Sequence, residues 1–385
     1  MYYNSHKKSG TITIKVVCAV CFLFFSFLWL YDFEPDTIAI AQHVLSEGQT
    51  TYNPLVGAII ITVVLYALQR VVDSFIPLPK NVYALTYVPS MLIIAFISDI
   101  DVDIEVTSSL GMWWLVPIVL VAWAVVVWFA HQMMKYERDD RRPMGLFSYR
   151  VWKNLLQMAV MMFFVSLIGS TNAVFHYSAH AEVALINGDT DEALRVGEES
   201  SETDKRLTML RVFALSKKGQ LGERLFNYPI AGTSEDMLPM QPNALQILSA
   251  DSIWKHLGAI PSRACTSGEY YKSLERDSFA TSSVADYRLC GCLIDRRLDD
   301  FVKLLPKYYE VADSLPLPRH YQEALVLYRH LRTHPAIIYH NTVVDEDWKN
   351  LKQLEKGYNL LSERKYRVYD HYSGSYWYYY FYQRD

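Results

Sequence analysis

Five long apolar stretches near the N-terminus constrain the fold of this chain more than any other feature. They cover residues 12–30, 55–76, 82–97, 112–134 and 155–173. A helix of about 20 apolar residues crosses the hydrocarbon core of a bilayer, and within lipid every backbone polar group needs a partner in the same segment. The sequence therefore predicts an N-terminal bundle of five transmembrane helices over residues 1–174.

The third stretch is the shortest, and Pro89 lies in its middle, so a re-entrant segment is the alternative to a crossing. Lys and Arg concentrate on the cytoplasmic flanks of membrane helices. Two groups of cations occur here: Lys7, Lys8 and Lys15 at the first stretch, and Lys135, Arg138, Arg141, Arg142, Arg150 and Lys153 before the fifth. The two groups share a side only if an even number of crossings separates them. This distribution requires the third stretch to cross.

The intervening loops on the opposite side are acidic. Residues 31–54 and 98–111 contain no Lys or Arg, and they hold Asp32, Glu34, Asp36, Glu47, Asp99, Asp101, Asp103 and Glu105. We therefore expect a cytoplasmic N-terminus, insertion in the cytoplasmic (inner) membrane, and a periplasmic or otherwise extracytoplasmic location for everything after the fifth stretch. The first stretch ends in Phe27, Leu28, Trp29 and Leu30, which favours a retained helix over a cleaved signal peptide.

Composition changes sharply after the fifth stretch. From residue 175 onward charged residues are spread throughout, which predicts a soluble domain over 175–385. This length is sufficient to bury a core without help from disulfides or metals. The formal net charge of the chain is only −4, which disfavours a nucleic-acid partner.

The start of this domain contains two related pieces, at 181–194 and 210–226, whose glycines Gly188 and Gly219 are 31 residues apart. Each piece predicts a helix that ends at Gly, followed by a second amphipathic helix. This helical hairpin resembles a tetratricopeptide unit, with degenerate copies at 287–301 and 321–331. The overall prediction is an all-α protein. Small residues are expected where paired helices approach closely, namely at Ala184, Ala193, Ala214 and Ala324.

Several short motifs from residue 207 onward resemble those of an uncharacterised family of bacterial multi-pass membrane proteins. They are Lys218-Gly219-Gln220-Leu221, Phe226-Asn227-Tyr228-Pro229, His256-Leu257-Gly258 and the aromatic run from Tyr376 to Tyr382. The resemblance implies a fold and an envelope location, and the family brings no activity with it.

The first outward loop reads Asp32-Phe33-Glu34-Pro35-Asp36. It resembles the first periplasmic loop of multi-pass glycosyltransferases that use lipid-linked sugar donors. The resemblance implies that Glu34, Asp36 and Asp32 act as general base or bind a divalent metal beside the donor phosphate. The chain departs from that family in having fewer predicted spans and a non-contiguous acidic pair. The alternative is that acids accumulate here because the topology excludes Lys and Arg.

Other clusters do not predict a metal site. The alternating acids from Asp99 to Glu105 lack the Gly and Glu that a helix-loop-helix calcium loop needs, since Ile104 and Leu110 occupy those positions. A solvated loop or short strand is expected there instead. His176 and His180 are one helical turn apart without an evident third ligand, so they predict a polar helix face.

The domain after residue 175 contains three cysteines. Cys290 and Cys292 point to different faces of a predicted helix, so a disulfide, if formed, joins Cys265 to one of them. The aromatic segment 369–382 is expected to dock on the helical domain, with the lipid headgroup region as the alternative. Exposed aromatic patches of this size promote aggregation, which favours docking.

Two functions from different classes follow. The first is a membrane-anchored platform for an envelope protein or peptide partner, without a cofactor. The second is a glycosyltransferase, or a degenerate relative, with the acidic loop residues as its site.

Overall fold

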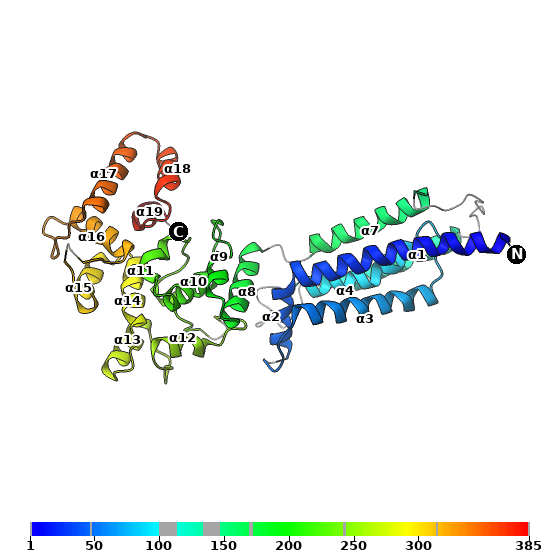
Figure 1. Cartoon of the computed structure of the whole chain (residues 1–385), viewed down its shortest axis with the longest axis horizontal. Coiled ribbons are helices and arrows are strands. Elements are labelled where there is room, and N and C mark those ends of the chain that lie inside the picture. Colours follow the sequence, from blue (N-terminus) through cyan, green and yellow to red (C-terminus); the bar gives the residue numbers. More distant parts are fainter. Residues whose placement is uncertain are drawn as a thin grey trace. The chain divides into compact units, whose positions relative to one another are not determined.

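The computed structural model describes residues 2–46, 48–99, 114–133, 147–168, 172–241, 244–312 and 315–383, with the side chains of 2–11 left aside. These ranges contain 18 α-helices and no strand (Figure 1), which confirms the all-α prediction for them. The chain divides into two compact units, Met1–Asn172 and Ala173–Asp385.

The first unit is a bundle of apolar helices. Its elements are α1 (Tyr2–Leu28), a π-helical turn (Trp29–Phe33), α2 (Pro35–Leu45), α3 (Pro54–Phe75), a 3-10 turn (Tyr83–Tyr87), α4 (Val88–Ser98), α6 (Leu115–Met133) and α7 (Tyr149–Ile168). Four helices are long and apolar enough to cross a membrane: Ile12–Phe33, Pro54–Phe75, Leu115–Gln132 and Tyr149–Ile168. They correspond to the first, second, fourth and fifth predicted spans.

The prediction of five long spans is wrong at the third. Residues Tyr83–Ser98 form only a shorter apolar helix, because a 3-10 turn occupies its first five residues and α4 has 11. Pro89 lies in the first turn of α4, where its missing N–H costs no hydrogen bond. The proline therefore marks the start of an α-helix and not the middle of a long one.

The fifth predicted span is displaced toward the N-terminus. We predicted residues 155–173, whereas α7 begins at Tyr149 and ends at Ile168. Arg150 and Lys153 consequently belong to the first turns of α7 and not to the loop before it. A prediction from hydropathy alone starts the helix at the first apolar run and therefore leaves out polar residues of its first turns.

Polar contacts hold α4 against α3 inside this bundle. The fully buried Gln69 amide donates to Tyr83 Oη at 3.1 Å and to Thr86 Oγ1 at 3.0 Å. Ser90 Oγ donates to the Leu65 carbonyl at 2.8 Å. Each bond satisfies a polar group that would otherwise be buried without a partner.

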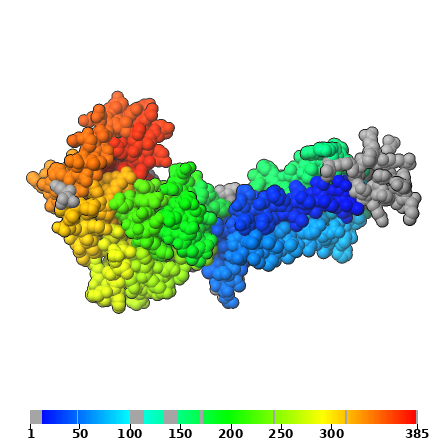
Figure 2. All heavy atoms as spheres, viewed as in Figure 1, coloured from blue at the N-terminus to red at the C-terminus, as the bar shows by residue number. Residues whose placement is uncertain are grey.

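The second unit consists of short helices packed around one core that runs through most of it. Figure 2 shows the surface of this unit, coloured from green at its first helix to red at its last. In chain order they are α8 (Ala173–Ile186), α9 (Thr190–Arg195), α10 (Lys205–Lys217), α11 (Leu221–Arg224), α12 (Ala250–Leu257), α13 (Ser267–Arg276), α14 (Ser283–Ile294), α15 (Leu298–Tyr308), α16 (Arg319–Leu331), α17 (Thr342–Lys356), α18 (Leu361–Tyr372) and α19 (Tyr376–Tyr382). Two 3-10 turns, Leu225–Asn227 and Ser234–Met237, lie between α11 and α12.

The predicted helix ends at glycine are confirmed. Gly188 and Gly219 have φ of 81° and 63°, which L side chains rarely adopt, and each separates two helices. In the α14–α15 pair Arg296 takes the equivalent place with φ 57°. The second helices of the first two pairs, α9 and α11, have only six and four residues. A regular tetratricopeptide repeat is therefore not established, although all four predicted packing alanines are buried.

A buried carboxylate ties the first helix of this unit to a distant loop. Glu182, on α8, is fully buried and accepts hydrogen bonds from three successive backbone amides. They belong to Gln246, Ile247 and Leu248, at 3.0, 2.6 and 3.0 Å from Oε2. Burial raises the pKa of the Glu182 carboxyl, and the three backbone N–H groups act in the opposite direction by stabilising its charged form.

Replacing Glu182 by Gln should therefore loosen this loop, because the Gln side chain presents an NH2 group to amides that need an acceptor. We expect amides 246–248 to lose about 2 to 3 kcal/mol of protection in hydrogen exchange. Glu192→Gln on the partly exposed side chain of α9 is the control and should leave this protection unchanged. Equal protection in Glu182→Gln and the wild type would contradict the assigned role.

Candidate functional site

The acidic residues predicted from the first outward loop lie at the junction of α1 and α2. Glu34 is buried, Asp36 lies in the first turn of α2, and Asp32 is exposed. The described residues contain no group of three His, Cys, Asp or Glu side chains arranged to hold a metal ion. The catalytic role of Glu34, Asp36 and Asp32 stays a prediction.

The remaining predicted clusters fall in different places. His180 Nε2 lies 3.5 Å from Glu192 Oε1, which joins α8 to α9. All five cysteines are free, Cys290 and Cys292 are buried, and burial raises the pKa of the Cys290 thiol well above its ordinary value. Several predicted residues lie outside the described ranges, namely Glu47, Asp101, Asp103, Glu105, Lys135, Arg138, Arg141 and Arg142.

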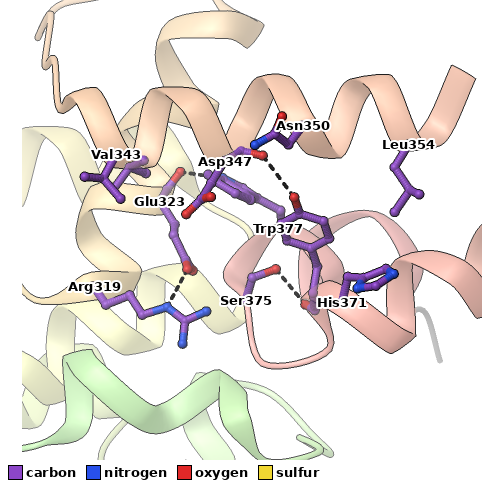
Figure 3. A pocket seen from close by; sticks show the side chains of 11 residues that line it. Arg319, Glu323, Val343, Asp347, Asn350, Leu354, His371, Ser375 and Trp377 are labelled. Atoms are coloured by element: carbon purple, nitrogen blue, oxygen red, sulfur yellow. Dashed lines mark hydrogen bonds and ion pairs between the residues drawn. The ribbon is translucent and has the colours of Figure 1, made fainter.

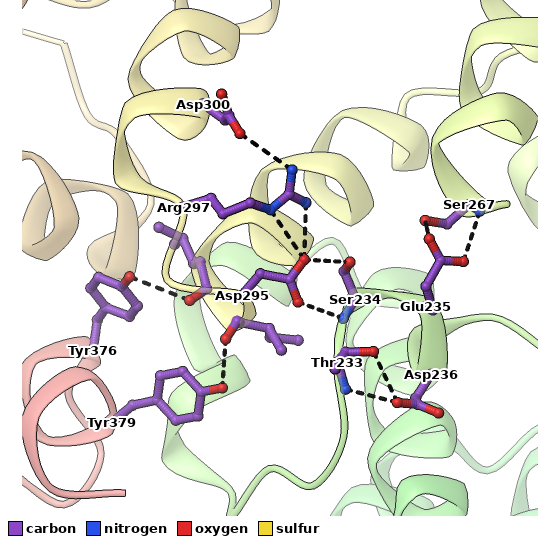
Figure 4. Close-up of polar contacts among 12 residues, drawn as sticks. Thr233, Ser234, Glu235, Asp236, Ser267, Asp295, Arg297, Asp300, Tyr376 and Tyr379 are labelled. Atoms are coloured by element: carbon purple, nitrogen blue, oxygen red, sulfur yellow. Dashed lines mark hydrogen bonds and ion pairs between the residues drawn. The ribbon is translucent and has the colours of Figure 1, made fainter. Parts of the chain in front are cut away.

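The aromatic C-terminal segment docks on the second unit, as predicted. Tyr376 is fully buried, and Trp377 is 2% exposed. The hydroxyls of Tyr376 and Tyr379 donate to the carbonyls of Leu293 and Ile294 at the end of α14, at 3.3 and 2.8 Å (Figure 4). The segment therefore completes the core of this unit.

A groove of about 610 Å³ opens among the four helices α16 to α19 (Figure 3). Its wall combines apolar and polar side chains: Arg319, Glu323, Val343, Val344, Asp347, Asn350, Leu354, His371, Tyr372, Ser375 and Trp377. Asn341 caps the start of α17 by accepting from the amides of Val343 and Val344. Ser375 caps α19 in the same way through the Tyr378 amide. These caps fix the directions of two of the four helices.

A buried carboxylate forms the floor of this groove. Glu323 accepts from Arg319 Nε at 2.9 Å, from the Tyr376 amide at 2.7 Å and from His320 Nδ1 at 3.0 Å. The other ring nitrogen of His320, Nε2, accepts from the Phe226 amide at 3.3 Å, which leaves Nδ1 to donate to Glu323. The Glu323 carbonyl also accepts from the Trp377 indole at 2.8 Å.

These contacts decide the charge of Glu323. Burial alone would raise the pKa of this carboxyl, but the adjacent His320, Arg319 and Tyr376 amide together hold the pKa below its ordinary value. The side chain is therefore an anion at neutral pH. Sequence analysis did not identify it, because its partner Tyr376 is remote in the chain, as is Phe226, which binds the neighbouring His320.

The rim of the groove carries polar side chains that are free to bind. Asp347, Asn350 and His371 are exposed, and within the described part of the chain their side chains make no hydrogen bond or ion pair. Arg319 uses Nε for Glu323, and its terminal nitrogens have no partner among the same residues. The rim thus offers one fixed cation, one carboxylate, one amide and one imidazole.

A second cavity, of about 460 Å³, lies where the turn Ser234–Met237 meets α13 and α14. Carboxylates fasten this junction: Asp295 accepts from the amide and hydroxyl of Ser234, and Glu235 does the same for Ser267 (Figure 4). Arg297, also on its wall, is paired with Asp295. Because these contacts fasten the turn to α13 and α14, we regard this cavity as a structural junction.

Comparison with known proteins decides the family. The sequence matches the family of unknown function DUF6057 over residues 104–263 and 273–383, which is more than half of the chain. The chain belongs to DUF6057. No curated protein matches it, and no solved structure does.

The match to DUF6057 confirms the prediction that this chain belongs to an uncharacterised family. Both cavities of this DUF6057 protein lie within or beside the matched ranges, whereas Asp32, Glu34 and Asp36 lie outside them. The function of the DUF6057 protein must accordingly be argued from its own residues.

The buried anion makes the stability of the second unit depend on pH. The pKa of Glu323 is lower in the folded state than the ordinary value of 4.5, so its stabilisation is present above that value and is lost as the pH falls through the folded pKa. We expect Glu323→Gln to lower the stability at pH 7 by about 2 kcal/mol. The same variant should lose less stability than the wild type between pH 6 and pH 3.

Thermal unfolding across this pH range measures both effects. Glu346→Gln changes an exposed carboxylate on α17 and serves as the control. Parallel pH profiles of Glu323→Gln and the wild type would show that folding does not lower the pKa of this carboxyl.

Proposed function

We propose that this DUF6057 protein is a membrane-anchored binding protein whose groove among α16 to α19 holds an extended segment of a partner polypeptide. The observation that carries the proposal is a preformed groove with unpartnered polar groups on its rim and apolar side chains on its wall. Ligand sites commonly have this composition, with few polar groups that fix the orientation of the ligand.

The chemistry of the rim supports a peptide as the ligand. The Asn350 side chain carries both a donor and an acceptor, which match the C=O and N–H of one peptide bond. Arg319 and Asp347 supply one charge of each sign, and neither sign dominates. Val344, Leu354 and Trp377 offer apolar contact for a side chain of the segment. A polyanion or a purely apolar ligand would leave one of these features unused.

We further propose five crossings, a cytoplasmic N-terminus and a second unit outside the cytoplasmic membrane of a bacterial cell. The 3-10 turn and α4 together span about 26 Å at the usual rises, which is close to the roughly 30 Å of a hydrocarbon core. The acidic loops at 31–54 and 98–111 carry no Lys or Arg. In this arrangement the helical pairs of the second unit act as a degenerate tetratricopeptide-like platform toward envelope proteins.

The glycosyltransferase hypothesis ranks second. It rests on the order of residues around Glu34 and Asp36, and a divalent metal enters only within it. Surface glycans that change when both residues are replaced by Ala would favour it over the binding function.

Site-specific photo-crosslinking tests the groove. A benzoyl-phenylalanine placed at position 350 or 371 of the full chain should yield the same discrete adduct in cells. The same group at Gln353, on α17 and not among the residues that line the groove, is the matched control and should not yield it. A synthetic peptide from the crosslinked protein should bind Asp347→Asn about tenfold more weakly than the wild type.

Two results would contradict the binding function. One is equal crosslinking at positions 350, 371 and 353. The other is a peptide affinity that is unchanged when both Asp347 and Asn350 are replaced.

Reporter fusions test the topology separately. Alkaline phosphatase, which is active only outside the cytoplasm, should be active when fused after Asp385. A fluorescent protein that matures only in the cytoplasm should stay dark there. A second phosphatase fusion after Pro79 should be inactive, because residues 76–82 then face the cytoplasm. An inactive phosphatase after Asp385 would place the second unit inside and overturn the five-crossing arrangement.

A further inference from the structure

Among the residues that the structure describes, three cations at one end of the membrane bundle have no anionic partner. The side chains of Lys80, Arg150 and Lys153 are half-buried, and in the described part of the chain they make no hydrogen bond or ion pair. A half-buried charge loses part of its hydration, and this loss is usually offset by an opposite charge. The absence of an anionic partner for these cations among the described residues therefore needs an explanation.

One buried side chain brings these residues together. Asn154, on α7, is fully buried, and its Nδ2 donates to the carbonyls of both Lys80 and Arg150 at 2.8 Å. Its Oδ1 accepts from the Ala84 amide at 2.8 Å. Because both carbonyls bind the same nitrogen, the loop before the 3-10 turn and the first turn of α7 are adjacent. Lys153 follows Arg150 by three residues and so lies on the same side of the helix.

One carboxylate that the structure describes at this end of the bundle, that of Asp73, is already engaged. Asp73, near the end of α3, binds Lys15 at 2.6 Å and Arg70 at 3.1 Å. The Lys15 ammonium also lies over the ring of Tyr83, in the 3-10 turn that Asn154 holds. Within the described residues at this end, cations therefore outnumber acids, and Asp73 is not available to Lys80, Arg150 and Lys153.

The aromatic residues beside these cations are typical of the membrane interface. Phe147, Tyr149 and Trp152 are 88%, 79% and 57% exposed. Amphipathic aromatic rings concentrate at the level of the lipid headgroups, and exposed cations near them contact lipid phosphates. A preference for cations on the cytoplasmic side accounts for their presence, but not for the adjacency of their two backbone segments or for their half-burial.

We propose that Lys80, Arg150 and Lys153 form a binding site for the phosphate of an anionic phospholipid. The Arg150 guanidinium suits bidentate contact with a phosphate, and the two ammonium groups supply additional charge. The glycerol and acyl chains of the lipid then lie against the exposed apolar surface of the bundle. This site is independent of the groove in the second unit.

Native mass spectrometry of the full chain in detergent tests the proposal, with phosphatidylglycerol as the anionic lipid and phosphatidylcholine as the zwitterionic one. We expect tighter binding of phosphatidylglycerol. Each of Lys80→Gln, Arg150→Gln and Lys153→Gln should weaken it about fivefold, and the triple variant about 100-fold. Arg70→Gln removes a charge from the same end of the bundle and is the matched control, with an effect below twofold.

Thermal unfolding in phosphatidylcholine micelles shows that the variants are folded. Unchanged phosphatidylglycerol binding by a folded triple variant would overturn the proposal. Binding of inorganic phosphate that the three substitutions abolish, without any preference between the two lipids, would also overturn it, because the occupant would then be a free anion. If the triple variant does not fold, Arg150→Lys with Lys153→Arg keeps the charge and must keep the lipid preference.

Discussion

Hydrogen bonds from backbone amides to buried carboxylates hold the second unit together. The unit contains no strand among its described residues, so no ladder of backbone bonds connects remote parts of the chain. Glu182 and Glu323 supply such connections by accepting from amides that lie more than 50 residues away. A carboxylate accepts several such bonds at once, which is why one side chain can fix a whole loop or helix end. The apolar core and the groove both depend on these two anchors.

The sequence predicted those features that are encoded locally. Long apolar runs revealed the four helices that are long and apolar enough to cross a membrane, and glycine revealed the helix ends at Gly188 and Gly219, because both signals depend only on neighbouring residues. The length of the third helix was overestimated, because the 3-10 turn before Pro89 shortens the α-helix. The repeat was overestimated because α9 and α11 are much shorter than the hydrophobic pattern suggested. The periodicity of apolar residues along the sequence does not predict the residue at which tertiary contacts end a helix.

The groove among α16 to α19 could not be predicted from the sequence, for a different reason. Its wall comes from four helices, and its floor depends on Glu323, which binds the amide of Tyr376, 53 residues further along the chain. No short motif links Arg319, Asn350 and His371, and the DUF6057 family brings no assigned activity. The aromatic terminus was predictable as a docking element because of its composition, but its role in forming one wall of the groove was not.

The position of Trp377 in chain order has a consequence for biosynthesis. The indole bonds to the Glu323 carbonyl and forms part of the groove wall, so neither the wall nor the buried anion site is complete until the segment 376–379 has been made and docked. A nascent chain that has emerged only as far as α18 exposes the apolar surfaces of α14 and α16. Completion of the core is thus a late event, and chains that stop before it present the exposed apolar surface by which chaperones and proteases recognise unfinished proteins.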